Sequence, residues 1–176
     1  MITMFVFLFA ISLSCGSAMA AAGAHGFDVE RYRELATETL KIVLQDGDQA
    51  TVLANTQELI EMAKEGCLEH MRAPDTPDKE KQLLALLMKH ADTLTSLSHD
   101  ELDESWHEGG VPKTAGIDIE EFDHFSVTMS HYDAVVLPAA ANILFKEYQR
   151  TGDKENLDYV ADELKEAIEH TDFLVD

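Results

Sequence analysis

The chain has 176 residues, of which 34 are acidic and 13 are basic, and its formal net charge is −21. An apolar fraction of 45% excludes wholesale disorder, and the length suits one domain with a real core. The negative charge argues against nucleic acid and anionic lipid as partners, because both require a basic face. We therefore expect no nucleic-acid partner, whereas divalent cations and basic proteins remain compatible with this charge.

The first 20 residues have the pattern of a signal peptide. Residues 5–13 form an apolar run too short to span a bilayer, and Ala18-Met19-Ala20 is an A-x-A cleavage site. Cleavage there would leave residues 21–176 as a single domain without a transmembrane helix. We expect export to the periplasm or the cell exterior, with a lipoprotein anchor at Cys15 as the alternative.

Beyond the signal, apolar residues recur at spacings of three and four, which is the period of helices with one buried face. Asp28 is an N-cap residue for the first helix, and Gly47 ends it. The second helix continues to about Met71, and Pro74 and Pro77 mark the turn before the third. The three apolar stripes are Val29, Tyr32, Ala36, Leu40 and Val43; Leu53, Thr56, Ile60, Ala63 and Cys67; and Leu83, Leu87, Ala91 and Leu94.

The second half of the chain continues this helical period. Ser98 and Glu101 form a capping-box pattern for a short fourth segment. We expect Asp118 to cap a long helix that Pro138 kinks or restarts, and a last helix to follow Gly152. The two stripes are Phe122, Phe125, Met129, Tyr132 and Val136, and Leu157, Val160, Leu164 and Ile168. The predicted fold is all-α, an antiparallel helical bundle with about four main helices plus a short crossover helix.

Residues 98–124 concentrate the acidity of the chain. Their nine carboxylates are accompanied by a single basic residue, Lys113, so this segment has a net charge of −8. It also contains three of the eight histidines and the only tryptophan, Trp106. Imidazole and carboxylate together are the usual ligands of zinc, iron, manganese or nickel.

Two Glu-x-x-His pairs in this segment suggest where a metal could bind. In a helix, Glu104 would share a face with His107, and Glu121 with His124, which is the spacing found in di-iron bundles. Our prediction is a divalent-metal site formed by Asp103, His107, Glu121, His124 and His131. The alternative is that these acids cap helices and face solvent.

A second pattern extends the prediction to the neighbouring helices. Glu120, His124 and His131 fall within a narrow stripe of the helix predicted from Asp118, and this stripe points away from its apolar face. A ligand bound there would be shared with another helix, another subunit or a partner. His170 on the last helix is the expected second contributor.

Cys67, His70 and Met71 form a third pattern, with the soft ligands that copper(I) or haem iron accepts. Core packing is the other interpretation of Cys67, because it lies on the apolar seam of its helix. His90 lies within an apolar stripe and is the position at which haem b, a weaker alternative, would find an axial ligand. Covalent c-type haem is excluded, since the chain has no C-x-x-C-H.

These observations together predict an exported, acidic helical bundle that binds a divalent metal ion or a metal cofactor. The alternative is a structural or protein-interaction module whose acidic surface engages a basic partner. A small metal-dependent enzyme is the third interpretation, and the chain lacks the G-x-S-x-G, G-x-G-x-x-G and H-E-x-x-H motifs. Assembly into a homodimer stays open.

Overall fold

The computed structural model describes residues 27–174, and this part of the chain contains helices and no strand. The predicted signal peptide, its cleavage site and Cys15 lie outside the described residues. The α-helices are α1 (Val29–Leu44), α2 (Gln49–Arg72), α3 (Asp78–His90), α4 (His99–Leu102), α5 (Gly110–Thr114), α6 (Val127–Thr151) and α7 (Glu155–His170). Shorter turns are η1 (Ala91–Ser96), the π-helical η2 (Asp103–His107), η3 (Ile119–Glu121) and η4 (Thr171–Phe173).

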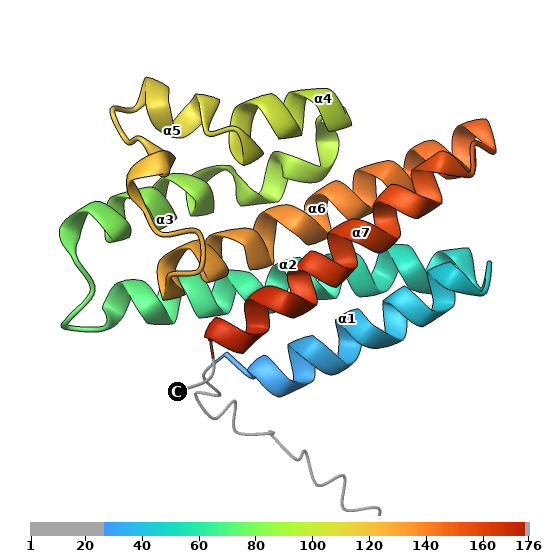
Figure 1. Ribbon diagram of the computed structural model, residues 1–176, viewed down its shortest axis with the longest axis horizontal. Helices are drawn as coiled ribbons and strands as arrows, with labels where there is room; N and C mark the ends of the chain where they lie inside the picture. The colour runs from blue at the N-terminus through green and yellow to red at the C-terminus, as the bar shows by residue number, and fades with distance from the viewer. Residues whose placement is uncertain (1–26, 175–176) are drawn as a thin grey trace, which may run out of the picture.

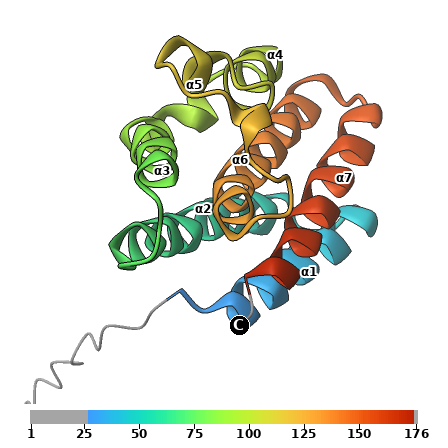
Figure 2. The same cartoon turned by 60° about the vertical axis from the view of Figure 1, so that its left-hand side comes forward.

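Four long helices form an antiparallel bundle (Figure 1). α6 packs against α2 and α7, and α1 closes the ring by packing against the same two helices. α3 and η1 pack against α2 and α6, and the segment from α4 to α5 lies beyond them (Figure 2). The predicted all-α bundle with four main helices is confirmed. No helix within residues 27–174 has both the length and the apolar character needed to cross a membrane.

Several of these helices begin at capping residues that the sequence predicted. Asp28 accepts a hydrogen bond from the backbone N–H of Arg31 at 2.9 Å, and Ser98 and Glu101 form a complete capping box at α4. The third predicted stripe is buried at all four positions, of which Leu83 and Leu87 belong to α3 and Ala91 and Leu94 to η1. These caps and stripes depend on residues close in sequence, which is why they could be predicted.

The start of α6 differs from the prediction. Asp118 caps only the single turn η3, by accepting from the N–H of Glu120, and α6 begins at Val127 after a new cap. That cap is Ser126, whose hydroxyl accepts from the N–H of Met129 at 3.2 Å. His124 therefore lies in a turn between two capped segments rather than on the face of a helix.

Pro138 does not end or restart α6, which continues as one helix. Proline has no N–H, so the carbonyl of Ala134 lacks its usual partner four residues on. The hydroxyl of Tyr32 on α1 donates to that carbonyl at 2.8 Å. α1 thus supplies the hydrogen bond that the helix itself cannot make.

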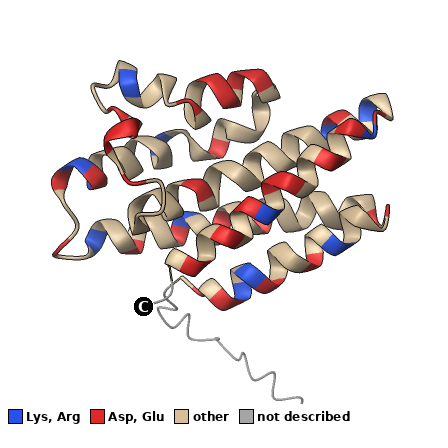
Figure 3. Ribbon diagram, in the orientation of Figure 1, with Lys and Arg blue, Asp and Glu red and all other residues tan. Residues whose placement is uncertain are grey.

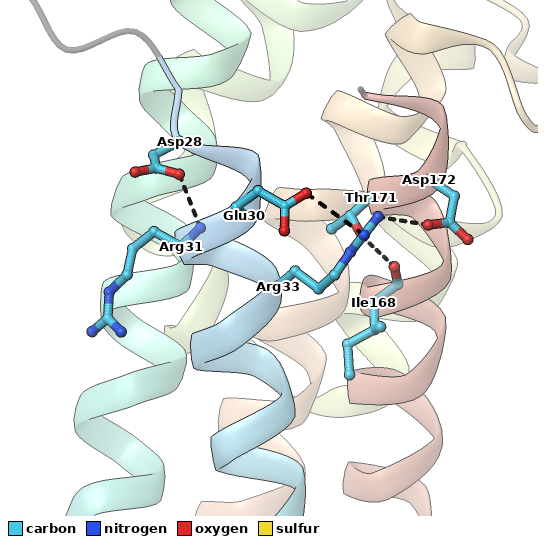
Figure 4. A network of polar contacts seen from close by, with 7 residues as sticks. All are labelled: Asp28, Glu30, Arg31, Arg33, Ile168, Thr171 and Asp172. Atoms are coloured by element: carbon cyan, nitrogen blue, oxygen red, sulfur yellow. Dashed lines mark hydrogen bonds and ion pairs between the residues drawn. The ribbon is translucent and has the colours of Figure 1, made fainter. Parts of the chain in front are cut away.

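A polar network joins the beginning of α1 to the end of α7 (Figure 4). Arg33 donates to the hydroxyl of Thr171 at 2.7 Å and pairs with Asp172 at 2.5 Å. The Thr171 hydroxyl in turn donates to the carbonyl of Ile168 at 2.5 Å. This network holds the segment that follows His170 against α1.

Every long helix contains acidic residues, although α6 has only Asp133 and Glu147 (Figure 3). From α4 through η2 the charged positions are all Asp or Glu, apart from the histidines at the two ends. Asp103 of this segment lies close enough to Glu163 of α7 to help raise the pKa of that carboxyl.

Candidate metal centre

Three side chains from different segments converge at one end of the bundle. His124 comes from the turn before α6, Asp133 from α6, and His170 from the last residue of α7. One donor atom of each lies within 4.8 Å of the donor atoms of the other two. Asp133 and His170 are buried, with exposed fractions of 5% and 1%, whereas His124 is exposed.

The buried pair has polar atoms that the described part of the chain does not satisfy. Asp133 Oδ2 lies 3.4 Å from His170 Nε2, and neither atom has a hydrogen-bond partner there. Leaving such atoms unpaired costs about 1–3 kcal/mol each. Bonds of about 2.0–2.1 Å to a tetrahedral zinc ion would place ligand atoms about 3.4 Å apart. The separation of these two atoms therefore suits ligands of one metal ion.

Neighbouring groups orient the His170 ring. Its Nδ1 lies 3.3 Å from the hydroxyl of Ser130, one helical turn before Asp133. When Nδ1–H donates to that hydroxyl, the lone pair of Nε2 points toward Asp133, which is the tautomer a metal requires. The His124 ring packs edge-on against His170 with 5.0 Å between centroids.

The pKa values of Asp133 and His170 show that neither the ionised carboxylate nor the protonated imidazole is stabilised at this place. Burial, reinforced by the charges of Glu166 and Glu163, raises the pKa of Asp133 to about 8. Burial, followed by the neighbouring His124 and His107, lowers the pKa of His170 to about 4. A bound cation would favour the ionised carboxylate and the neutral imidazole at once.

Further carboxylates surround the pair. Burial and then Glu166 raise the pKa of Glu163 on α7 to about 7, with a further contribution from Asp103. Glu166 Oε1 lies 4.0 Å from His170 Nε2. Asp103 Oδ1 lies 3.3 Å from His107 Nδ1 across η2, a short π-helix of the kind often found at functional sites.

A cavity of about 220 Å³ adjoins two of the three converging side chains, His124 and Asp133. It is lined by His107, Ile119, Glu120, Phe122, His124, Met129, Tyr132 and Asp133. The hydroxyl of Tyr132 donates to the carbonyl of Trp106 at 2.7 Å, which holds η2 against α6. The site therefore has both buried donors and space for a small ligand.

The structure brings together some of the predicted metal ligands and separates others. Asp103 and His107 lie beside the site, and His124 belongs to it. Glu121 instead forms an ion pair with Lys79 of α3. The predicted set therefore does not form one cluster, although three of its members surround the same place.

His131 was expected to point outward, and this expectation is wrong. It is buried on another side of α6 from Asp133, and its ring lies 5.0 Å from that of His70. The outward orientation assumed that α6 exposes one face to solvent, whereas every residue from Thr128 to Phe145 is buried.

Asp133, Glu163 and Glu166 are site residues that the sequence analysis missed. Asp133 had a recognisable signal, because it is the one carboxylate within the buried run from Thr128 to Phe145 of α6. His170 was anticipated as a second contributor, but its partner is His124 rather than His131.

Cys67 of the soft-ligand pattern lies in the hydrophobic core. The thiol is buried in the core and donates to the carbonyl of His131 at 3.3 Å, and burial raises its pKa to about 12. His90 packs against Trp106 with 5.4 Å between ring centroids. The core interpretation of Cys67 is confirmed, and haem binding stays an untested expectation.

Comparison with known proteins returned no match to a family model, a curated protein or a solved structure. The fold defines the class of this protein as an antiparallel four-helix bundle. Within that class, its particular feature is a cluster of histidines and carboxylates at one end, where α6 begins and α7 ends.

Proposed function

We propose that this protein binds a divalent transition-metal ion through His124, Asp133 and His170. The proposal rests on three metal-ligating side chains that lie close together. Two of them, Asp133 and His170, have buried polar atoms without a hydrogen-bond partner among the described residues. Two imidazoles and one carboxylate suit Zn²⁺ and Fe²⁺, whereas Mg²⁺ and Ca²⁺ prefer all-oxygen ligands. The surrounding Glu163, Glu166 and Asp103 add the negative potential that attracts a cation.

The proposal is tested by titrating the chelator-treated protein with Zn²⁺ in a calorimeter and by recording the visible spectrum with Co²⁺. We expect one ion to bind, and intense d–d bands that indicate four- or five-fold coordination by nitrogen and oxygen. Asp133→Asn and His170→Gln should each weaken binding by about 10–100-fold or more. His99→Ala, a histidine outside the cluster, is the matched control and should leave the affinity unchanged.

Two results would contradict the proposal. One is a protein that binds none of these metals and whose melting temperature does not respond to them. The other is binding that Asp133→Asn and His170→Gln leave intact, because it would place the metal elsewhere.

Export remains part of the proposal and rests on the sequence alone. N-terminal sequencing of the protein recovered from outside the cytoplasm should begin at Ala21. Recovery of the uncleaved chain from the cytoplasm would contradict export.

A protein-interaction role is the second candidate function. Phe125 and Phe173 stack with their centroids 4.7 Å apart, although each is about half exposed, and Val127 beside them is 43% exposed. An exposed aromatic pair within an acidic surface suits a basic protein partner. A salt-sensitive complex that Phe125→Ser weakens and that forms without metal would favour this candidate.

A further inference from the structure

A second and larger cavity lies at the same end of the bundle, separate from the three converging metal ligands. Its volume is about 640 Å³, within the range of roughly 300–1,000 Å³ typical of small-molecule sites. Its lining residues come from the segments around the beginnings of α1, α3 and α6 and around the ends of α2 and α7. None of His124, Asp133 and His170 lines it.

The lining of this cavity is anionic and partly aromatic. Glu69, Asp75 and Glu80 contribute carboxylates, and no Lys or Arg of residues 27–174 is among the lining residues. Phe27 and Phe173 contribute aromatic rings, whose faces attract cations. A ligand that matches this lining has a positive charge and an apolar body.

A chain of hydrogen bonds crosses one wall of the cavity. The Thr128 hydroxyl donates to Glu80, so its oxygen must accept from Nε2–H of His70, at 2.9 Å. In the neutral form of His70, Nδ1 is then left as an acceptor. Both ends of the chain are therefore hydrogen-bond acceptors, to which a donor on a ligand in the cavity could bind.

His131 in the same wall has a polar atom to which the described residues offer no hydrogen bond. It is 8% exposed and lines the cavity, and its Nδ1 has no hydrogen-bond partner in the described part of the protein. A Cβ on Gly66 would come within 3.0 Å of that atom and 2.8 Å of Phe27, so the glycine allows this close packing. Buried polar atoms without partners are uncommon, so this atom calls for a partner that the described residues do not supply.

We infer that this cavity binds a small organic cation, an amine with an aromatic or apolar body, with Glu80 as its principal counter-charge. A metal ion is a poorer match, because the only described cluster of three metal-ligating side chains is the one at Asp133. The inference does not depend on the proposed metal-binding function.

The test is calorimetric titration of the full chain in the presence of a chelator. Phenethylammonium is the cationic probe, and 2-phenylethanol is its neutral counterpart of nearly the same shape. We expect the cation to bind about tenfold more tightly than the alcohol. Glu80→Gln, which keeps an oxygen for Thr128, should abolish that preference.

Glu120→Gln removes a carboxylate from the smaller cavity and is the matched control, which should leave the preference unchanged. Circular dichroism and the melting temperature would verify that both variants fold. Equal affinity for the amine and the alcohol, no binding of either, or a preference that Glu80→Gln leaves intact would each overturn the inference.

Discussion

Asp133 Oδ2 lies 3.4 Å from His170 Nε2, yet the two side chains do not form an ordinary ion pair. Burial raises the pKa of the carboxyl to about 8 and lowers the pKa of the imidazole to about 4. Near neutral pH the metal-free protein therefore holds a protonated acid beside a neutral imidazole. This arrangement has consequences for stability and for metal binding.

Stability of the metal-free protein should fall as the pH rises from 6.5 to 8. The Asp133 carboxyl ionises at about 3.8 when unfolded and at about 8 when folded, so the folded state retains a proton through this window. Below pH 6.5 this loss is offset by His170 and His131. Burial lowers the pKa of each to about 4, so their protonation at lower pH favours the unfolded state. Denaturation in urea at a series of pH values should show a fall of at most about 1.4 kcal/mol per pH unit for each group.

Asp133→Asn should flatten this pH dependence, apart from a smaller fall up to pH 7 due to Glu163. Asp158→Asn, at an exposed position of α7, is the control and should retain the full dependence. A parallel loss of stability in Asp133→Asn and the unaltered chain would show that Asp133 is not the responsible group.

Zinc affinity should rise with pH over the same window. Binding requires the ionised carboxylate, so each ion that binds must displace the proton of Asp133 until the pH reaches about 8. We expect the dissociation constant to fall by up to about tenfold per pH unit. Calorimetry in two buffers of different ionisation enthalpy would measure the released proton, and a pH-independent affinity would contradict this prediction.

Tyr32→Phe should destabilise the bundle by about 1–3 kcal/mol, because the carbonyl of Ala134 would be left buried without a donor. Restoring an N–H through Pro138→Ala should reduce the loss caused by Tyr32→Phe, as a double-mutant cycle would measure. Tyr159→Phe removes an exposed hydroxyl bonded to Glu155 and should have little effect. Additive effects of Tyr32→Phe and Pro138→Ala would refute this account of how α6 continues through proline.

Arg33→Met should lower both stability and zinc affinity. The guanidinium holds Thr171 and Asp172, and His170 directly precedes them, so its loss would free the end of α7 (Figure 4). We expect a loss of about 1–3 kcal/mol in the free energy of unfolding. Arg31→Met serves as the control, because Arg31 makes only longer ion pairs at the surface. Unchanged zinc affinity in Arg33→Met would show that His170 is positioned without this network.

The helices that were predicted well are those whose signals lie within a few residues. The Asp28 cap and the Ser98–Glu101 capping box act over one helical turn, and tertiary contacts did not override them. The predicted start of α6 was wrong because Asp118 and Ser126 are both good N-cap residues, and the sequence does not say which of them begins the long helix. The mistaken orientation of His131 has another cause, because α6 is buried on all sides from Thr128 to Phe145 and has no solvent face there.

The sequence by itself determined the all-α class, the buried stripes and the segment in which His107 and His124 lie among many acids. Only the tertiary structure decided that Asp133 of α6 and His170 of α7 meet beside His124, and that Glu121 pairs with Lys79 instead. Helical periodicity is a local property that determines which face of a helix is buried. Which residues of two helices meet depends on how all the helices pack around their shared core, and short-range sequence patterns do not record this.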